Sequence, residues 1–249
     1  MKLQKLLSYT RQAVEKYHLI EAGDKIAVGL SGGKDSITLL YALSHLSKFY
    51  PKPFSVYAVT IDMGFSNYDV SPLEKICKSL NVSFVKISTE IGTIIFEERK
   101  EQNPCSLCAT FRRGALLHAA KELGCNKIAY GHHNDDIIET MMMALFFEGR
   151  FYSFGPYTYF EDQEIAIIRP LIYVAENEII GFMNQQQLKP VKNPCPADHH
   201  TKREEMKQLI KQLNSQYPGL KKRLFSAIQN GAIEDWNQIK RRDFKENYE

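Results

Sequence analysis

Short apolar runs alternate with longer segments of helical periodicity through the first two thirds of this chain. Each run has the length of a strand, and the segments between the runs have the spacing of helices. Parallel neighbours need a crossover connection, which is usually helical, so the alternation predicts an α/β fold with a doubly wound, mainly parallel sheet. The expected strands are KIAVGL (25–30), FSVYAVTID (54–62), VSFVKIS (82–88), NKIAYGH (126–132) and IAIIRPL (165–171).

The same pattern divides the 249 residues into three regions. We expect an N-terminal helix within 1–22 and the α/β domain at 23–190. From 191 to 249 the pattern changes to a Pro-rich loop with a cysteine, followed by basic helices, so we expect a small helical C-terminal region. Inside the α/β domain the expected helices are 37–49, one that begins at Ser71, 106–123 and 135–148.

The composition excludes several classes of protein. With 44% hydrophobic residues the chain is too apolar to be intrinsically disordered. Its longest apolar run, MMMALFF (141–147), is far shorter than the ~20 residues of a membrane span. The charged N-terminus lacks the apolar stretch of a signal peptide. Five cysteines, an odd number in a long chain, favour a reducing compartment. We therefore predict a cytoplasmic protein that does not associate with membranes.

The segment SGGKDS (31–36) lies between the first strand and its helix. Two glycines let the backbone approach a ligand closely, and the start of a helix offers unpaired N–H groups and a positive dipole end. These features predict a phosphate-binding loop. The segment matches neither the Walker A pattern nor G-x-G-x-x-G. The alternative is an ordinary turn rich in small residues.

A second polar cluster, GHHNDDIIET (131–140), follows the fourth strand and opens a helix. Asp135 and Glu139 are four residues apart and share one helix face. Carboxylates at a helix start are favoured by the dipole, so helix capping is one interpretation. The other is Mg²⁺ on a polyphosphate, because this hard cation takes oxygen ligands. Both clusters are expected at the carboxyl ends of strands, where such sheets bind ligands.

The cysteines suggest a metal site. Cys105 and Cys108 form C-x-x-C, and Cys195 lies in NPCPAD, with Asp198, His199 and His200 close behind it. A redox pair, a structural zinc site completed by one of those three residues, and an iron–sulfur cluster with one open iron all fit. Spacing alone slightly favours zinc. Cys77 and Cys125 are read as buried structural residues.

SGGKDS after an apolar strand resembles the PP-loop, S-G-G-x-D-S, of the ATP pyrophosphatase superfamily, whose members break ATP between the α- and β-phosphates. The resemblance implies that the loop holds the pyrophosphate and that residues at the end of the second strand, with Gly131, border the nucleotide. Asp135 and Asp35 become the expected catalytic carboxylates. Arg112 and Arg113 follow C-x-x-C by about one turn, where either could stabilise negative charge on phosphate, and Arg112 is the expected catalytic cation. The implied ATP-binding residues are Ser31, Gly32, Gly33, Asp35, Ser36, Ala58, Ile61, Asp62 and Gly131.

CSLCATFRRG, GHHNDDIIET, IIRPL and SQYPGLKKRLFSAIQN together resemble the tRNA 2-thiocytidine synthetase (TtcA) family over residues 20–230. This likeness implies an ATP-dependent tRNA sulfurtransferase that replaces the C2 oxygen of a cytidine in the anticodon loop by sulfur. It also reverses the order of the metal interpretations: it implies a [4Fe–4S] cluster on Cys105, Cys108 and Cys195. The family usually has a second C-x-x-C, whereas this chain has Asp198 at the last position.

The expected cofactors are therefore ATP, Mg²⁺ and the cluster. The expected partners are tRNA, a second copy of the chain, and a sulfur donor, which is either sulfide or a cysteine desulfurase persulfide. Between Lys202 and Arg223 seven Lys or Arg stand against two Glu, a surplus that suits RNA phosphates. Two alternatives stay open: a lysidine-type or amide-forming ligase with a zinc site, and a module that binds adenine nucleotide without turnover.

Overall fold

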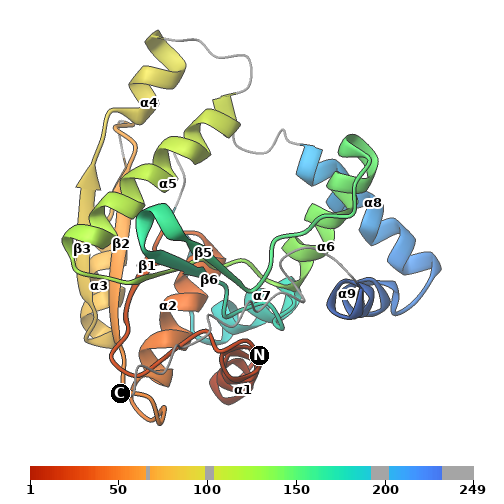
Figure 1. The fold of residues 1–249 in the computed structure, drawn as a ribbon, viewed down its shortest axis with the longest axis horizontal. Coiled ribbons are helices and arrows are strands. Elements are labelled where there is room, and N and C mark those ends of the chain that lie inside the picture. The colour runs from red at the N-terminus through yellow and green to blue at the C-terminus, as the bar shows by residue number, and fades with distance from the viewer. Residues whose placement is uncertain (66–67, 99–103, 192–201, 232–249) are drawn as a thin grey trace, which may run out of the picture.

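The computed structural model describes residues 1–65, 68–98, 104–191 and 202–231. Its centre is a six-stranded sheet in the order β3-β2-β1-β4-β6-β5. All neighbours are parallel except β5 and β6, which are antiparallel. The predicted doubly wound, mainly parallel α/β fold is confirmed (Figure 1). The strands are β1 (Lys25–Gly29), β2 (Ser55–Asp62), β3 (Ser83–Ser88), β4 (Lys127–Ala129), β5 (Tyr157–Phe160) and β6 (Ile165–Ile168).

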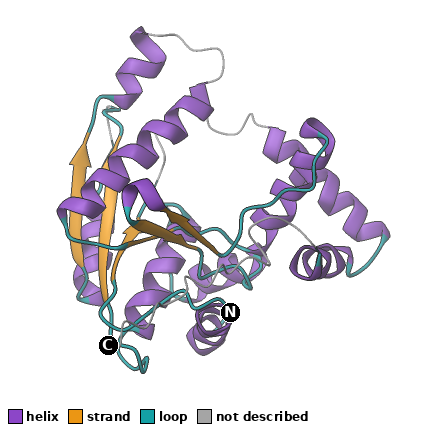
Figure 2. Ribbon diagram, in the orientation of Figure 1, coloured by secondary structure: helices purple, strands orange, loops and turns teal. Residues whose placement is uncertain are grey.

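Helices cover both faces of the sheet (Figure 2). On one face, α1, α2, α3 and α7 share a core with Ile26 and Val28 of β1, and on the other α5 packs against Ala27. Apolar side chains on both faces explain why the central strand reads as a continuous apolar run. The helices are α1 (Leu3–Lys16), α2 (Lys34–Leu46), α3 (Ser71–Leu80), α4 (Ile91–Thr93), α5 (Pro104–Glu122), α6 (Asn134–Met143), α7 (Glu176–Gln185), α8 (Lys202–Gln216) and α9 (Leu220–Asn230).

The described elements differ from the expected ones mainly in three places. The strand expected at 126–132 covers only Lys127–Ala129, since the chain turns toward α6 directly after it. The helix expected at 135–148 ends as α6 at Met143 and continues as a π-helical turn, Ala144–Glu148. The antiparallel edge strand β5 and the helix α7 have no counterpart among the predicted elements.

The C-terminal helices pack beside α6 rather than on the sheet. α6 contacts both α8 and α9, and Figure 1 shows these three helices together on the side of the molecule away from β2 and β3. Met206, Ile210, Phe225 and Ile228 join the same core as α1 and α2. None of the helices in the described ranges has the length and apolarity needed to cross a membrane.

Candidate functional site

The loop between β1 and α2 begins with a turn that favours glycine. Gly32 has φ of +83°, and a Cβ there would lie 3.0 Å from the Cβ of Val191. Val191 also donates its backbone N–H to the carbonyl of Gly32 at 2.9 Å. A side chain at this position would therefore strain the loop and push away the segment that closes over it.

The loop hydroxyls bond within the loop. Ser31 Oγ donates to Ser36 Oγ (3.2 Å), and Ser36 Oγ donates to the carbonyl of Gly33 (3.0 Å). The first N–H groups of α2 follow, and a helix leaves such groups without intrahelical partners. A cluster of N–H donors, a positive dipole end and two serines makes this loop an anion site.

A cavity of about 1100 Å³ opens over the carboxyl ends of the strands. It lies where the sheet order changes direction, with β2 on one side of β1 and β4 and β6 on the other, the usual place for a ligand in such a fold. The loop residues Ser31 and Gly33 to Ser36 line the cavity between its two ends. The β2 end is lined by Val59, Ile61, Met63, Phe65 and Tyr68, and the other end by Tyr130, His132, Tyr152, Phe154, Thr158, Phe160 and Arg169.

The residues predicted on β2 lie on both faces of that strand. Ile61 lines the cavity, together with Val59 and Met63. Ala58 is fully buried in the core on the other side. Asp62 pairs with Lys86 at 2.7 Å and accepts from the backbone N–H of Gly64 at 3.0 Å. Since side chains alternate along a strand, Ala58 and Asp62 have only their backbone to offer a base in the cavity.

Gly131 lines the cavity at the point where β4 leads into α6. A Cβ at this residue would lie 2.8 Å from the carbonyl carbon of Asp35 and 3.0 Å from the backbone nitrogen of Ser36. Those atoms are backbone and cannot move aside as a side chain can. The glycine therefore lets the acidic motif pack directly on the phosphate-binding loop.

Asp35 and Lys34 connect the loop to α7. Lys34 Nζ lies 3.0 Å from Asp35 Oδ2 and 3.1 Å from Glu176 Oε1. Asp35 Oδ1 is buried and has no hydrogen-bond partner among the described residues, and His133 Nε2 lies 3.5 Å from it. A buried carboxylate oxygen without a donor is the kind of atom that a bound cation satisfies.

Asp135 is held by two groups from outside its own helix. Its Oδ1 contacts Lys221 Nζ of α9 at 2.5 Å, and its Oδ2 accepts from the backbone N–H of Glu176 at 2.7 Å. Its side chain is 5% exposed. The neighbouring Asp136 lines the cavity, whereas Asp135 is not among the described lining residues. The catalytic role expected for Asp135 stays a prediction.

Charges from α8 complete this cluster. Arg203 lies 3.4 Å from Asp136 Oδ1 and 3.5 Å from Glu139 Oε2. Burial raises the pKa of Glu139 to about 7, and the nearby Asp136 acts in the same direction, while Arg203 opposes both. Glu176 behaves in the opposite way: burial would raise its pKa, but hydrogen bonds from Lys207 and Lys34 lower it to about 2. The two C-terminal helices thus supply cations to carboxylates beside the loop.

Helix α5 carries the C-x-x-C motif at its start. Cys105 is exposed and Cys108 is buried against Ile91 and Ile95. One turn further on, Arg112 and Arg113 line the cavity, as do Ser106 and Thr110. Cys195, Asp198, His199 and His200 lie outside the described residues, and within those residues no three metal-binding side chains come together. Burial raises the pKa of both Cys77 and Cys125 to about 11, as expected for structural thiols.

Several residues of the site were missed by sequence reasoning. Arg169 stands directly after β6 within the motif IIRPL, so its position at a strand end was an available signal. Tyr68, Glu176 and Phe154 are in loops or at a helix start without a recognisable pattern. Tyr68 donates its hydroxyl to the carbonyl of Ser31 at 3.3 Å.

Comparison with known protein families identifies the loop. The PP-loop domain family matches residues 4–213. The chain belongs to the PP-loop family. The recognition of SGGKDS as a PP-loop is thereby confirmed.

Similar proteins sharpen this assignment. The chain is 39% identical over 222 residues to the tRNA-cytidine(32) 2-sulfurtransferase of Pelobacter propionicus, covering 88% of this chain and 82% of that protein. It is 36% identical over 233 residues to the protein of the same name from Geobacter sulfurreducens, covering 92% and 91%.

Among solved structures, this PP-loop protein is similar to the U34-tRNA thiolase NcsA from Methanococcus maripaludis with its [4Fe–4S] cluster. The TM-score is 0.73 at 25% identity, with 91% of this chain and 78% of that chain covered. The NH₃-dependent NAD synthetase of Campylobacter jejuni, with a TM-score of 0.51 at 18% identity over 92% and 93% of the chains, shares the fold alone.

Proposed function

We propose that this protein is an ATP-dependent tRNA sulfurtransferase that converts a cytidine of the anticodon loop, position 32 by the names of its relatives, to 2-thiocytidine. The observation that carries the proposal is a single cavity bordered by a PP-loop on one side and by the helix of a C-x-x-C motif on the other. An enzyme that activates a carbonyl and then delivers sulfur to it needs both chemistries at one place.

The chemistry has two steps. The C2 oxygen of the cytosine attacks the α-phosphorus of ATP, and the bond from that phosphorus to the bridging oxygen breaks, releasing pyrophosphate. A sulfur nucleophile then attacks C2, and AMP leaves with the original oxygen. The PP-loop N–H groups and serines hold the pyrophosphate, and Arg112 neutralises charge on the transferring phosphate. The first step makes a poor leaving group into a good one.

Mg²⁺ belongs to this proposal as the companion of ATP. The buried Oδ1 of Asp35 lacks a donor among the described residues, so this carboxylate would be able to hold the cation. Asp135 is the second carboxylate that we propose for positioning Mg²⁺, and one of its oxygens contacts Lys221.

The described thiols fit an iron–sulfur cluster. Cys105 and Cys108 are three residues apart at the start of α5, where the dipole favours thiolates, and sulfur is the ligand type that iron–sulfur clusters take. Cys195 is proposed as the third ligand, with Asp198 near the open iron. When bound, the cluster supplies a site for the sulfur that replaces oxygen.

The remaining expectations are also proposals. They are the division of the chain at 22 and 190, the sulfide or persulfide donor, the homodimer and the cytoplasmic location. The amide-forming ligase and the non-catalytic nucleotide module are less well supported, because neither accounts for relatives named as sulfurtransferases.

The products of ATP test the proposal. Protein prepared without oxygen is incubated with ATP, Mg²⁺, sulfide and unmodified tRNA, and nucleotides and tRNA nucleosides are analysed. We expect AMP, pyrophosphate and 2-thiocytidine, all abolished by Asp35→Ala or Ser36→Ala, and unaffected by Ser79→Ala, which changes an exposed serine on α3. ADP as the sole nucleotide product would contradict the proposal.

A further inference from the structure

The end of the cavity away from β2 is built around a buried arginine. Arg169 is 8% exposed and follows β6. Its Nη1 donates to the carbonyl of Gly155 at 2.6 Å and to Thr158 Oγ1 at 3.1 Å, and its Nε donates to His132 Nδ1 at 3.3 Å. These contacts fix the guanidinium, and the guanidinium in turn fixes the imidazole.

This contact determines where His132 carries its proton. A guanidinium only donates, so Nδ1 must accept, and the proton of the neutral ring is on Nε2. Burial, reinforced by the charge of Arg169, lowers the pKa of His132 to about 4, so the ring is neutral at physiological pH. His132 therefore presents one N–H donor at Nε2.

The Nε2 donor borders the cavity. His132 is a lining residue, and among the described residues no hydrogen-bond partner is found for Nε2. The buried polar side-chain atoms without a partner in that part of the chain are Asp35 Oδ1 and His133 Nδ1. Nε2 of His132 is not one of them, and because the ring lines the cavity we take Nε2 as its donor toward the cavity.

Aromatic rings surround this donor. The Phe154 and His132 rings are 4.6 Å apart between centroids, and the Tyr130 ring is 5.6 Å from that of His132. Arg169 lies 4.9 Å from the centre of the Phe154 ring, and Tyr152 lines the cavity close by. Flat aromatic side chains next to a fixed donor are how proteins hold an unstacked nucleobase.

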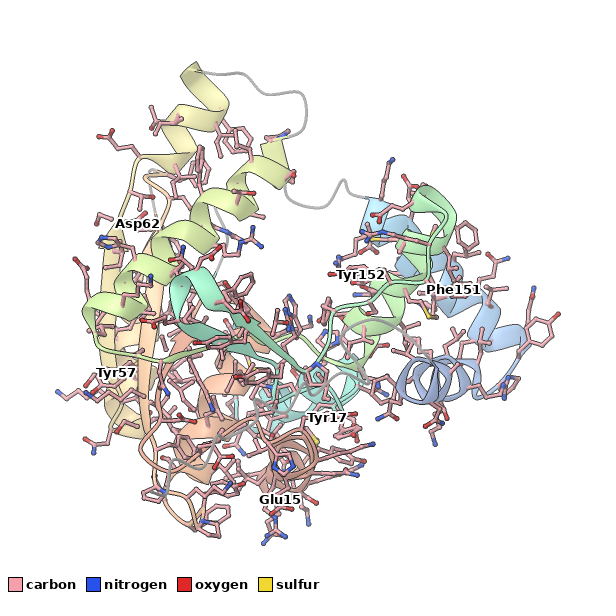
Figure 3. The ribbon with its side chains drawn as sticks, in the orientation of Figure 1. Glu15, Tyr17, Tyr57, Asp62, Phe151 and Tyr152 are labelled. Carbon is pink, nitrogen blue, oxygen red and sulfur yellow. The ribbon has the colours of Figure 1, made fainter. Side chains whose placement is uncertain are left out.

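The cavity has space for a second planar ligand beside ATP. Its volume of about 1100 Å³ is at the upper limit for a site that holds one small molecule. We place the adenine at the apolar β2 end, as the resemblance to PP-loop proteins implies, and the phosphates at the PP-loop. Figure 3 shows Asp62, at the end of β2, well separated from Tyr152, which lies beside α6 at the other end. A base that attacks the α-phosphorus needs its own place next to the loop.

We infer that this end of the cavity is the subsite of the target cytosine, and that His132 Nε2–H donates to its acceptor edge, O2 and N3, with Arg169 as the positioning residue. The inference rests on the proposed function. Uracil has a proton on N3, so it would place an N–H group against the Nε2–H of His132. The same donor that holds cytosine therefore disfavours uridine at this position.

The test uses full-length, cluster-loaded protein and two tRNA transcripts, with cytidine or uridine at the target position. His132→Leu removes the donor, whereas His132→Gln replaces it with an amide that both donates and accepts. Thiolation under kcat/KM conditions is measured alongside the Kd of ATP. His118→Leu and His118→Gln are matched controls, because His118 is an exposed residue on α5 whose side chain is 76% accessible.

We expect His132→Leu to lower thiolation of the cytidine transcript roughly 10- to 100-fold while the Kd of ATP stays within about twofold. We expect His132→Gln to recover most of this activity and to narrow the preference for cytidine over uridine by about tenfold or more. If His132→Leu instead weakens ATP binding by the same factor as thiolation, adenine occupies this end and the inference is wrong.

The inference is also wrong if both His132 variants keep the preference of the wild type for cytidine over uridine. A wild-type protein that thiolates neither transcript contradicts the proposed function itself. An active wild type whose His132 variants behave like the His118 controls contradicts only the inference about the cytosine subsite.

Discussion

At the scale of single residues, Gly131 has no side chain, and this lets the motif GHHNDDIIET pack against the loop SGGKDS. Gly131 brings the acidic motif against the backbone of Asp35 and Ser36. A resemblance to PP-loop proteins implied that Gly131 borders the nucleotide, and the structure gives a steric reason for a glycine there. Neither the motif spacing nor the composition could show that the neighbouring atoms are backbone.

The variant Gly131→Ala tests this packing. Its Cβ would meet the carbonyl carbon of Asp35 at 2.8 Å, so the PP-loop must shift, and we expect ATP affinity to fall at least tenfold. Overpacking of this kind also costs about 1–3 kcal/mol of stability. Nucleotide titration and thermal unfolding measure the two effects. Gly114→Ala is the control, because a Cβ there meets nothing within 4 Å and alanine suits a helix.

At the scale of elements, helices α8 and α9 supply cations to the carboxylates of the site, which their composition did not predict. The surplus of positive charge in 202–223 indicated an RNA-binding surface. However, Lys207 is half-buried and contacts Glu176 at 2.7 Å, and Lys221 is half-buried and contacts Asp135. A charge count made from the sequence gives each lysine one free positive charge. Only the packing of the helices shows which charges are neutralised within the protein.

The exposed lysines should therefore carry the salt dependence of tRNA binding. We expect the double variant Lys211→Gln/Lys222→Gln to flatten the slope of log K against log salt by roughly one to two, since each phosphate contact contributes about 0.7–0.9. The double variant Lys207→Gln/Lys221→Gln should leave the slope unchanged and weaken ATP binding. Filter binding at several salt concentrations measures the slope. If the slope flattens for Lys207→Gln/Lys221→Gln and not for Lys211→Gln/Lys222→Gln, the paired lysines bind RNA and this prediction is wrong.

Element boundaries were predictable where the apolar pattern was strong. β1, β2 and β3 lie within one residue of the expected runs, because each run ends at polar or glycine residues. The edge strand β5 escaped prediction since its pattern, YTYF, is short and follows a glycine- and proline-containing segment. Antiparallel pairing with β6 is what gives it a defined structure.

At the scale of the whole molecule, the fold and the loop could be predicted, but the composition of the cavity could not. Its lining comes from segments between Gly29 and Val191 that are distant in sequence. Sequence reasoning found the polar loop because phosphate chemistry needs particular residues in a row. The aromatic end is assembled from separate loops by the sheet order. Arg169 has a local signal in its position after β6, whereas Phe154 has none.

The cluster belongs to the scale of the whole molecule, because its proposed ligands are distant in sequence: Cys105 and Cys108 are on α5, and Cys195 precedes α8. We expect anaerobically purified protein to absorb near 400 nm and to unfold at a higher temperature than the iron-free form, because a ligand that binds only the native state stabilises it. Serine at Cys105, Cys108 or Cys195 should remove the absorption, the thermal shift and tRNA thiolation.

Cys125→Ala is the matched control for the cluster, because its thiol is buried and the pKa of that thiol is raised to about 11. One zinc and no iron in fully active protein would contradict the cluster.

The contact between Lys221 and Asp135 has a consequence for biosynthesis. The PP-loop and its sheet are encoded in the first two thirds of the chain, so they emerge from the ribosome first. Asp135, however, gains its ammonium partner only after α9 has been translated. A nascent chain can therefore build the sheet before Asp135 has its ammonium partner, and the site is completed only once α9 has emerged.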